Sequence, residues 1–257
     1  MNYYNEFDPK AAAWLRELIK AKLIPAGEVD ERSIVDVQPA DLARFTQCHF
    51  FAGIGGWSYA LELAGWTSDK SVWSGSCPCQ PISRGGLGKG HADERHLWPA
   101  FYNLISKCKL ATIFGEQVAG TDGREWFAGV RADLESIGYA CGCSDLCAAS
   151  KALPHPRQRL FWVANSDCKF DSRIQRPGGG RSRAIPTIWQ SEKIFQAGQG
   201  RVNELVARRI TERIPSYAEA LLALDGIPDR LVFMRGAGNA IVPQVAAEFI
   251  SAFCETR

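Results

Sequence analysis

The sequence predicts an α/β protein with a doubly wound, mostly parallel sheet. Short apolar runs of strand length alternate with amphipathic helical segments from the N-terminus to residue 164. One predicted strand, Thr46–Phe51, runs into the glycine-rich Ala52–Gly56 and then into a helix at Trp57–Ala64, as in nucleotide-binding domains. The 257 residues suffice for one sizeable domain with a small appendage, so we expect a single Rossmann-like sheet.

Composition excludes several other classes. Hydrophobic residues make up 46% and charged residues 23%, no apolar run has the length of a membrane span, and the first residues do not resemble a signal peptide. Nine cysteines without disulfide-framework spacing favour a reducing cytoplasm. Net charge is only +2, but residues 165–214 contain ten Lys/Arg against five Asp/Glu, so a polyanion would meet this segment first. A solvated arginine-rich surface explains the same excess equally well.

The N-terminal segments predict two further strands. Met1–Tyr4 has strand character, and Asp8 can cap a helix over Ala11–Lys22 with Pro9 in its first turn. A turn at residues 25–27 then leads into Glu28 and an apolar stretch through Val37. Glu6 beside Phe7, just after a strand, offers what ribose hydroxyls and an adenine ring require; the alternative is a solvated residue before a helix.

A thiol follows the next strand. Val72 and Trp73 open a buried strand, and Pro78 keeps the backbone out of a helix, so Cys79 is expected where strand gives way to loop. Open α/β sheets place reactive groups there, and a thiol is nucleophilic where its surroundings favour the thiolate. Cys77 is the rival thiol, but we expect it to pack in the core.

The second half of the sheet offers charged residues at strand ends. Leu110–Phe114 reads as a buried strand that ends before Glu116, a position suited to proton donation. A helix over Glu125–Ile137 and a strand within Tyr139–Ala149 follow. Arg157 and Arg159, two apart on extended backbone, should point the same way before the strand Leu160–Ala164.

Six motifs together resemble those of the DNA (cytosine-5) methyltransferases. They are Pro78-Cys79-Gln80 with Ser83, the FAGIGG of residues 51–56, the GEQV of residues 115–118, the Arg157/Arg159 pair, the GNAIVPQ of residues 238–244, and the N-terminal Glu6-Phe7 with Glu28-Val29. The sequence departs from the family pattern at Glu28 (for Asp), Gln117 (for Asn) and His155 (for Gln).

The resemblance implies a role for each matching position. It implies catalytic or base-contacting roles for Cys79, Glu116, Arg157, Arg159, Gln80 and Ser83. It implies S-adenosylmethionine binding by Phe51, Ala52, Gly53, Ile54, Gly55, Gly56, Glu6, Phe7, Glu28, Val29, Asp30, Pro78, Asn239, Ala240 and Val242. Whether Glu28 or Asp30 meets the adenine is left open.

The order of these motifs differs from that of the family. Only about ten residues separate Gly65 from the nucleophile strand, too few for the ribose- and adenine-contacting strands that the family places there. Their motifs precede Thr46 instead. We therefore expect a permuted sheet, with the second and third strands coming before the first.

The resemblance also divides the chain. We expect a catalytic domain over residues 1–164 (1–45 for ribose and adenine, 46–164 for the rest), a small target-recognition region over 165–228, and a returning C-terminal motif and helix over 229–257. Residues 81–96, rich in glycine, are expected to close over DNA or to be an ordinary surface loop. Expected DNA contacts are Arg84, Lys89, Arg95, Arg181, Arg183, Arg208 and Arg209.

The implied reaction is methylation of carbon-5 of a cytosine flipped out of double-stranded DNA, through a Cys79 adduct, with S-adenosylhomocysteine as by-product. Two alternatives remain: a tRNA cytosine methyltransferase and a catalytically dead DNA-binding module. We expect a monomer in the cytoplasm of a bacterial or phage-infected cell, with a restriction endonuclease acting on the same site as a counterpart. We expect no metal and read Cys141, Cys143 and Cys147 as buried thiols rather than a zinc site.

Overall fold

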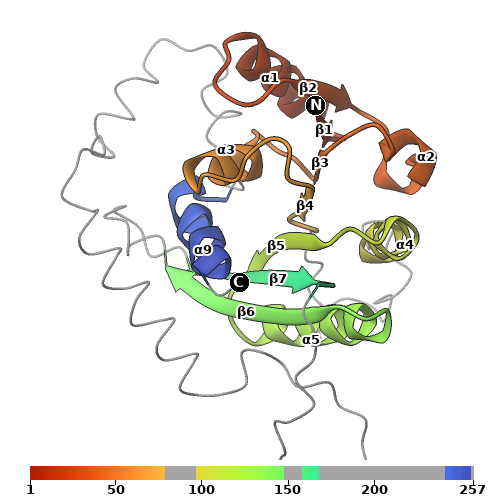
Figure 1. The fold of residues 1–257 in the computed structure, drawn as a ribbon, viewed down its shortest axis with the longest axis vertical. Helices are drawn as coiled ribbons and strands as arrows, with labels where there is room; N and C mark the ends of the chain where they lie inside the picture. The colour runs from red at the N-terminus through yellow and green to blue at the C-terminus, as the bar shows by residue number, and fades with distance from the viewer. Residues whose placement is uncertain (79–96, 148–157, 168–240, 256–257) are drawn as a thin grey trace, which may run out of the picture.

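The structure is a computed structural model that describes residues 1–78, 97–147, 158–167 and 241–255. Over these residues the chain forms one mixed sheet with helices on both faces (Figure 1). The strands are β1 (Asn2–Asn5), β2 (Gly27–Asp30), β3 (Gln47–Phe50), β4 (Val72–Gly75), β5 (Thr112–Val118), β6 (Ala140–Cys147) and β7 (Gln158–Asn165).

Helical segments connect the strands from β1 to β6, and α9 follows β7 in the described residues. The helices are α1 (Pro9–Lys20), the 3-10 helix η1 (Ile34–Asp36), α2 (Pro39–Leu42), α3 (Gly56–Leu63), α4 (Trp98–Cys108), α5 (Thr121–Ser136) and α9 (Pro243–Glu255). Helix α1 begins as the sequence predicts: Asp8 accepts from the backbone N–H groups of Lys10 and Ala11, with Pro9 in the first turn.

The strand order across the sheet is β2-β1-β3-β4-β5-β7-β6. The pairs from β2 to β5 are parallel, and those of β7 with β5 and β6 are antiparallel, so the sheet is mostly parallel as predicted. Of the two N-terminal strands, β1 lies beside β3, the strand that leads into the glycine turn, and β2 lies on the far side of β1. A permuted chain requires β1 to be adjacent to β3 in this way. How the observed strand order relates to that of the family stays a prediction.

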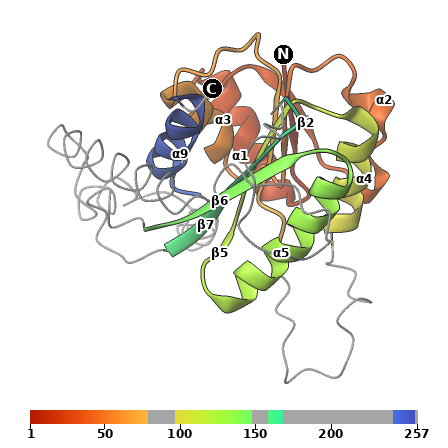
Figure 2. The same cartoon turned by 60° about the horizontal axis from the view of Figure 1, so that its bottom comes forward.

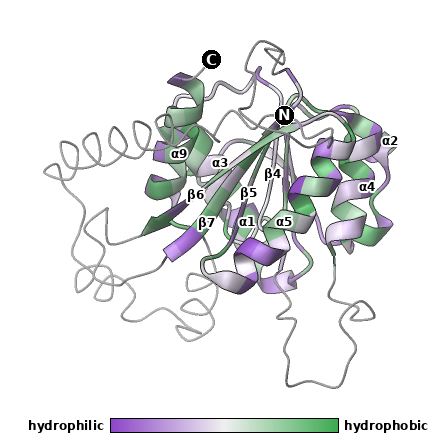
Figure 3. Cartoon of the chain, turned by 90° about the horizontal axis from the view of Figure 1, so that it is seen from below, coloured by the Kyte–Doolittle hydropathy of each residue, from purple (hydrophilic) through white to green (hydrophobic). Residues whose placement is uncertain are grey.

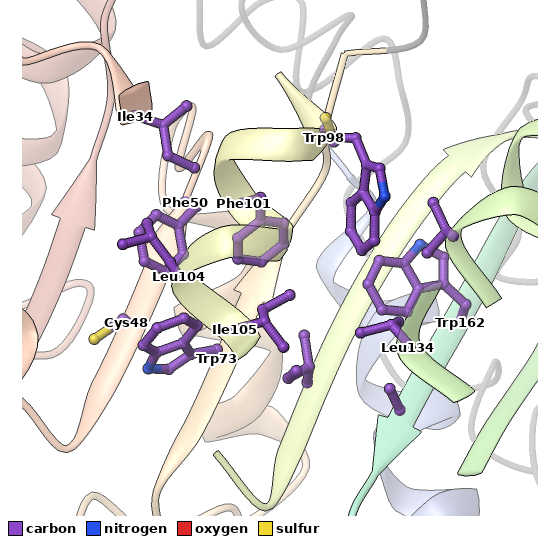
Figure 4. Packing of buried hydrophobic residues seen from close by; sticks show 14 of the residues in the cluster. Ile34, Cys48, Phe50, Trp73, Trp98, Phe101, Leu104, Ile105, Leu134 and Trp162 are labelled. Carbon is purple, nitrogen blue, oxygen red and sulfur yellow. The ribbon is translucent and has the colours of Figure 1, made fainter. Parts of the chain in front are cut away.

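Each face of the sheet has its own apolar core. Helices α2, α4 and α5 cover one face, and α1, α3 and α9 the other (Figures 1 and 2). On the first face Phe50, Trp73, Phe101 and Leu104 pack in one aromatic-rich cluster that extends to Trp162 (Figure 4). Burying these large side chains contributes most of the free energy that holds the helices on the sheet.

The C-terminal helix returns to the sheet. Helix α9 packs against α3, and its Phe249 and Phe253 contact Phe114 of β5. Ile241, two residues before α9, also meets the end of the glycine turn, because a Cβ added at Gly56 would lie 2.8 Å from Ile241 Cγ1. Val242 is half-buried on the same cluster. The chain therefore brings residues distant in sequence to the end of β3.

Candidate active site

The turn after β3 has the backbone of a ligand-binding loop. Phe51 has φ +52°, Gly53 +56° and Gly55 +79°, all in the left-handed region. For Phe51 this conformation costs about 1–2 kcal/mol, a strain that is common at functional sites. Nothing lies within 4 Å of where a Cβ of Gly53 would stand, so a ligand can approach this backbone closely. Helix α3 begins at once, with its N-terminal N–H groups beside the turn.

Glu6 connects the end of β1 to this turn. Its Oε2 accepts from the backbone N–H of Gly53 at 2.7 Å, and its Oε1 accepts from the N–H of Asp8 at 2.9 Å. The sequence predicted that these two motifs act together, and the sheet brings them into contact. Phe7 follows with 71% of its surface exposed, an unusual state for an aromatic residue beside a polar turn.

The carboxylates of β2 are both paired with arginines. Asp30, the last residue of the strand, accepts from Tyr3 Oη at 2.7 Å and from Arg32 through Nε and Nη2. Burial raises the pKa of Asp30, but the bonds from Arg32 and Tyr3 outweigh it, and the pKa lies below its ordinary value. Glu28, two residues earlier, pairs with Arg44 at 2.5 Å.

A cavity of about 560 Å³ opens beside these carboxylates. Glu28, Val29 and Asp30 line it together with residues of α2. The sequence did not reveal the arginines, because Arg32 and Arg44 lie in segments without a motif. The available signal was the short spacing in sequence between Asp30 and Arg32, which are two residues apart.

The strand before the predicted nucleophile ends where expected. β4 pairs with β5 as far as Gly75, and Ser76, Cys77 and Pro78 continue from it. Cys77 is only 3% exposed and belongs to the core on the α4 face. Its burial disfavours it as a nucleophile, as the sequence analysis anticipated.

Glu116 and Arg159 meet at the end of the sheet. Arg159 Nε lies 2.8 Å from Glu116 Oε1, and Glu116 is buried. The two residues come from β5 and β7, and the hydrophilic start of β7 that contains Arg159 is visible in Figure 3. The contact places the Glu116 carboxyl and the Arg159 guanidinium side by side at this edge of the sheet.

Glu116 and Gln117 lie inside β5 rather than after it. The sequence predicted a strand ending at Phe114, but pairing with β7 continues to Val118 opposite Arg159. Gln117 is buried, and its amide bonds to the carbonyl of Cys77 and to the N–H of Val118. The sequence analysis recognised this motif but did not anticipate the contact of Gln117 with the carbonyl of Cys77, two residues before the predicted nucleophile.

Many predicted site residues lie outside the described residues. These are Cys79, Gln80, Ser83, Arg84, Lys89, Arg95, Arg157, Arg181, Arg183, Arg208, Arg209, Asn239 and Ala240. The region 165–228 lies outside them as well except for its first three residues. The assignments of these residues stay predictions.

Among the described residues, no group of three or more His, Cys, Asp or Glu side chains could hold a metal ion. Cys141 and Cys143 lie on β6, and burial raises the pKa of the Cys141 thiol to about 12 and that of Cys143 to about 11. No described helix is long and apolar enough to cross a membrane.

Comparison with known proteins identifies the family. Residues 68–208 match the model of the C-5 cytosine-specific DNA methylases. The chain is 35% identical over 92 residues to the Type II methyltransferase M.AplI of Arthrospira platensis, covering 35% of this chain and 27% of that protein. It is 28% identical over 151 residues to M.NlaX of Neisseria lactamica, covering 53% and 47%. The chain thus spans less than half the length of these curated relatives.

Two solved structures share the fold. A DNMT2 mutant of Spodoptera frugiperda superimposes with a TM-score of 0.51 at 11% identity, covering 98% of this chain and 99% of that one. The S. pombe Dnmt2 methyltransferase gives a TM-score of 0.51 at 15% identity, covering 100% and 99%. At such low identity these matches show the fold alone.

Proposed function

We propose, because this chain belongs to the C-5 cytosine-specific DNA methylase family, that it methylates carbon-5 of cytosine in double-stranded DNA. The observation that best supports the proposal is the assembly at one end of the sheet. Glu6 binds the glycine turn at Gly53, and Glu116 pairs with Arg159. In open α/β sheets, ligands bind at the carboxyl ends of the parallel strands. Glu6, Gly53 and Glu116 lie there, and Arg159 meets the same edge from the first residues of the antiparallel strand β7.

The glycine turn fits S-adenosylmethionine. Gly53 leaves open space for a ligand, and Glu6 places a carboxylate where ribose hydroxyls can donate to it. Exposed Phe7 offers a surface for the adenine ring. Asp30 is the better partner for the adenine amino group, because it pairs with Asn5 at the strand ends, whereas Glu28 lies two residues earlier.

The remaining predicted cofactor contacts would complete this pocket. Phe51, Ala52, Ile54, Gly55 and Gly56 form the turn itself. Val29, Pro78, Asn239, Ala240 and Val242 would close it from the neighbouring strands and from the C-terminal motif.

The protein groups supply the activation of the base. Carbon-5 of cytosine is too weak a nucleophile to take a methyl group directly. The Cys79 thiolate adds to carbon-6, and the displaced electron pair moves towards ring nitrogen 3, which Glu116 protonates or hydrogen-bonds. Carbon-5 thereby becomes the nucleophilic end of an enamine.

The chemistry that a bound S-adenosylmethionine supplies is an electrophilic methyl group, taken up at carbon-5 while S-adenosylhomocysteine departs. Loss of the carbon-5 proton to solvent then returns an electron pair to the ring and expels the Cys79 thiolate, which restores the aromatic base. A stacked base is out of reach of this chemistry, so the cytosine must be flipped out, at a few kcal/mol.

Arg159 is suited to hold the flipped base. Its guanidinium is already fixed by Glu116, so little side-chain freedom is lost when a base binds beside the pair. Arg157, Gln80 and Ser83 would support the base and the thiol from neighbouring positions. The basic residues from Arg84 to Arg95 and from Arg181 to Arg209 would contact DNA phosphates.

The partners follow from this activity. We infer a protein that acts on DNA in the cytoplasm of a bacterial or phage-infected cell, with a restriction endonuclease of the same specificity as its counterpart. The relatives named above are Type II methyltransferases. A tRNA cytosine substrate is the second candidate, because the structures with the same fold are Dnmt2 proteins.

The test is transfer of a tritiated methyl group from S-adenosylmethionine to purified nucleic acid. Unmethylated plasmid DNA and total tRNA are offered separately and then in competition. Incorporation into DNA that tRNA does not suppress supports the proposal, and transfer to tRNA alone overturns it. Binding of DNA and of S-adenosylmethionine without transfer would indicate a dead DNA-binding module.

A further inference from the structure

The strand that leads to the nucleophile separates from the sheet early. The backbone pairing of β4 with β5 ends at Gly75 and Gly115, while β5 runs on to Val118 against β7. Ser76 and Cys77 therefore extend beyond the parallel ladder. A buried carbonyl outside a ladder needs another donor, since leaving it unpaired costs about 1–3 kcal/mol.

Gln117 supplies that donor. Its Nε2 donates to the carbonyl oxygen of Cys77 at 3.2 Å, and its Oε1 accepts from the N–H of Val118 at 2.8 Å. Both Gln117 and Cys77 are 3% exposed, so water does not compete for either bond. The side-chain amide thus takes the place of the missing backbone bond between β4 and β5.

A second side chain holds the same segment from the opposite face of the sheet. Trp57 Nε1 donates to Ser76 Oγ at 3.0 Å, and Trp57 is buried in the first turn of α3, directly after the glycine turn. The two residues before Pro78 are therefore bonded to α3 on one side and to β5 on the other. Trp57 adjoins the cofactor turn, and Gln117 adjoins Glu116.

These bonds limit where the thiol can be. Two residues of chain span at most about 7 Å, which sets the covalent range between the fixed backbone of Cys77 and the residue two positions later in the sequence. Pro78 narrows the range further, because its ring fixes φ near −65°. Reaction rates depend steeply on such placement: a misplacement of about 1 Å can reduce a rate by about 10²-fold.

We propose that Gln117 is a positioning residue for the Cys79 nucleophile, holding the Cys77 carbonyl so that the thiol and Glu116 keep a fixed separation. The inference rests on the proposed methyl transfer to cytosine. It concerns a position at which this sequence departs from the family pattern. We assign Gln117 a role in the rate of adduct formation rather than in the affinity for S-adenosylmethionine.

The decisive variant is Gln117→Glu, which keeps the size of the side chain. An ionised carboxylate still accepts from the N–H of Val118 but cannot donate to the Cys77 carbonyl, whereas the protonated carboxyl can. The defect should therefore be large at pH 8 and diminish as the pH falls towards 6, since burial favours protonation of a carboxyl. A role in folding alone would not give this pH-dependent rescue of rate.

A matched control is available in Gln47→Glu. Gln47 is also 3% exposed, and its Nε2 donates to the carbonyls of Thr67 and Lys70 at 3.1 and 3.3 Å. Gln47 is the first residue of β3, at the strand end opposite to the glycine turn. The control therefore matches the burial of the side chain and its donation to backbone carbonyls, while leaving the nucleophile segment intact.

The readout is the rate of covalent adduct formation on DNA amplified with 5-fluoro-dCTP in place of dCTP, in the presence of S-adenosylmethionine. Fluorine at carbon-5 cannot leave as a proton does, so the Cys79 adduct accumulates and is measured by gel shift. For Gln117→Glu we expect a rate about 10- to 100-fold below wild type at pH 8. The ratio of the variant's rate to the wild-type rate should rise at pH 6, and the KM for S-adenosylmethionine should stay within about twofold of the wild-type value. Dividing by the wild-type rate cancels the titration of the thiol itself.

The outcomes separate the two hypotheses. An active wild type with Gln117→Glu equal to it in rate and pH dependence overturns the positioning role, as does an equal loss in Gln47→Glu at the same folded fraction. If Gln117→Glu does not fold, Ser76→Ala tests the same segment, and an unchanged adduct rate in that variant overturns the role. Failure of the wild type to form adduct or transfer methyl groups overturns the proposed function and this inference with it.

Discussion

The free energy of unfolding should decrease on acidification because of one buried histidine. His49 on β3 is 1% exposed, with Nδ1 2.8 Å from Ser74 Oγ and Nε2 3.4 Å from Asn2 Nδ2. Since the amide nitrogen of Asn2 can only donate, His49 Nε2 accepts and Nδ1 carries the proton donated to Ser74, which assigns the neutral tautomer. Burial lowers the pKa of His49 from 6.5 to about 3.

The size and sign of the effect follow from this pKa. Between pH 6.5 and 3 the unfolded chain binds a proton at His49 that the folded protein does not, so the stability contribution falls as the pH decreases. From pH 7 to pH 5 the loss from this residue is about 2 kcal/mol, and the limit near pH 3 is about 5 kcal/mol.

The assay is urea unfolding at pH 7, 6 and 5 for wild type and His49→Gln. Glutamine can keep both hydrogen bonds but does not titrate, and every carboxylate is common to the two proteins. We expect the wild type to lose about 2 kcal/mol more than the variant between pH 7 and 5. Parallel pH profiles for the two proteins would refute the buried neutral histidine.

Three further predictions concern the site and the core. Glu6→Gln should weaken S-adenosylmethionine binding in calorimetry by about tenfold or more, because the ribose loses a charged acceptor next to Gly53; unchanged affinity would remove Glu6 from the pocket. Gly115→Ala should lower the unfolding free energy by about 2 kcal/mol or more, since a Cβ there would stand 2.1 Å from the Trp162 ring; a neutral effect in urea unfolding would contradict this packing. Phe101→Ala should cost about 3–5 kcal/mol in the same measurement, because its ring is fully buried among aromatic neighbours; a cost below 1 kcal/mol would be inconsistent with that burial.

The features that the sequence predicted correctly are mostly those set by residues close to one another in the chain. The cap of α1 by Asp8 and the strand, turn and helix around Gly53 were predicted because their signals lie within a few residues. The contact of Glu6 with Gly53 could also be anticipated, since both motifs follow parallel strands whose ends meet at one edge of a sheet.

Long-range pairing accounts for what could not be predicted. Gly115 suggested the end of a strand, but β5 continues because β7 pairs with it through Val118 and the Trp162 ring covers the glycine. Likewise, the pattern of β3 did not reveal that His49 would be satisfied by Asn2 and Ser74 on the neighbouring strands. Such partners depend on strand register, which one sequence does not display.

The central claim is methyl transfer to cytosine through Cys79. Its most direct test is nucleoside mass spectrometry of DNA from cells that lack other cytosine methylation and express either wild type or Cys79→Ser. We predict 5-methylcytosine with the wild type alone, and bisulfite sequencing of that DNA would then give the recognition site. Unmodified DNA from both strains would contradict the reaction, and equal methylation by Cys79→Ser would contradict the choice of nucleophile.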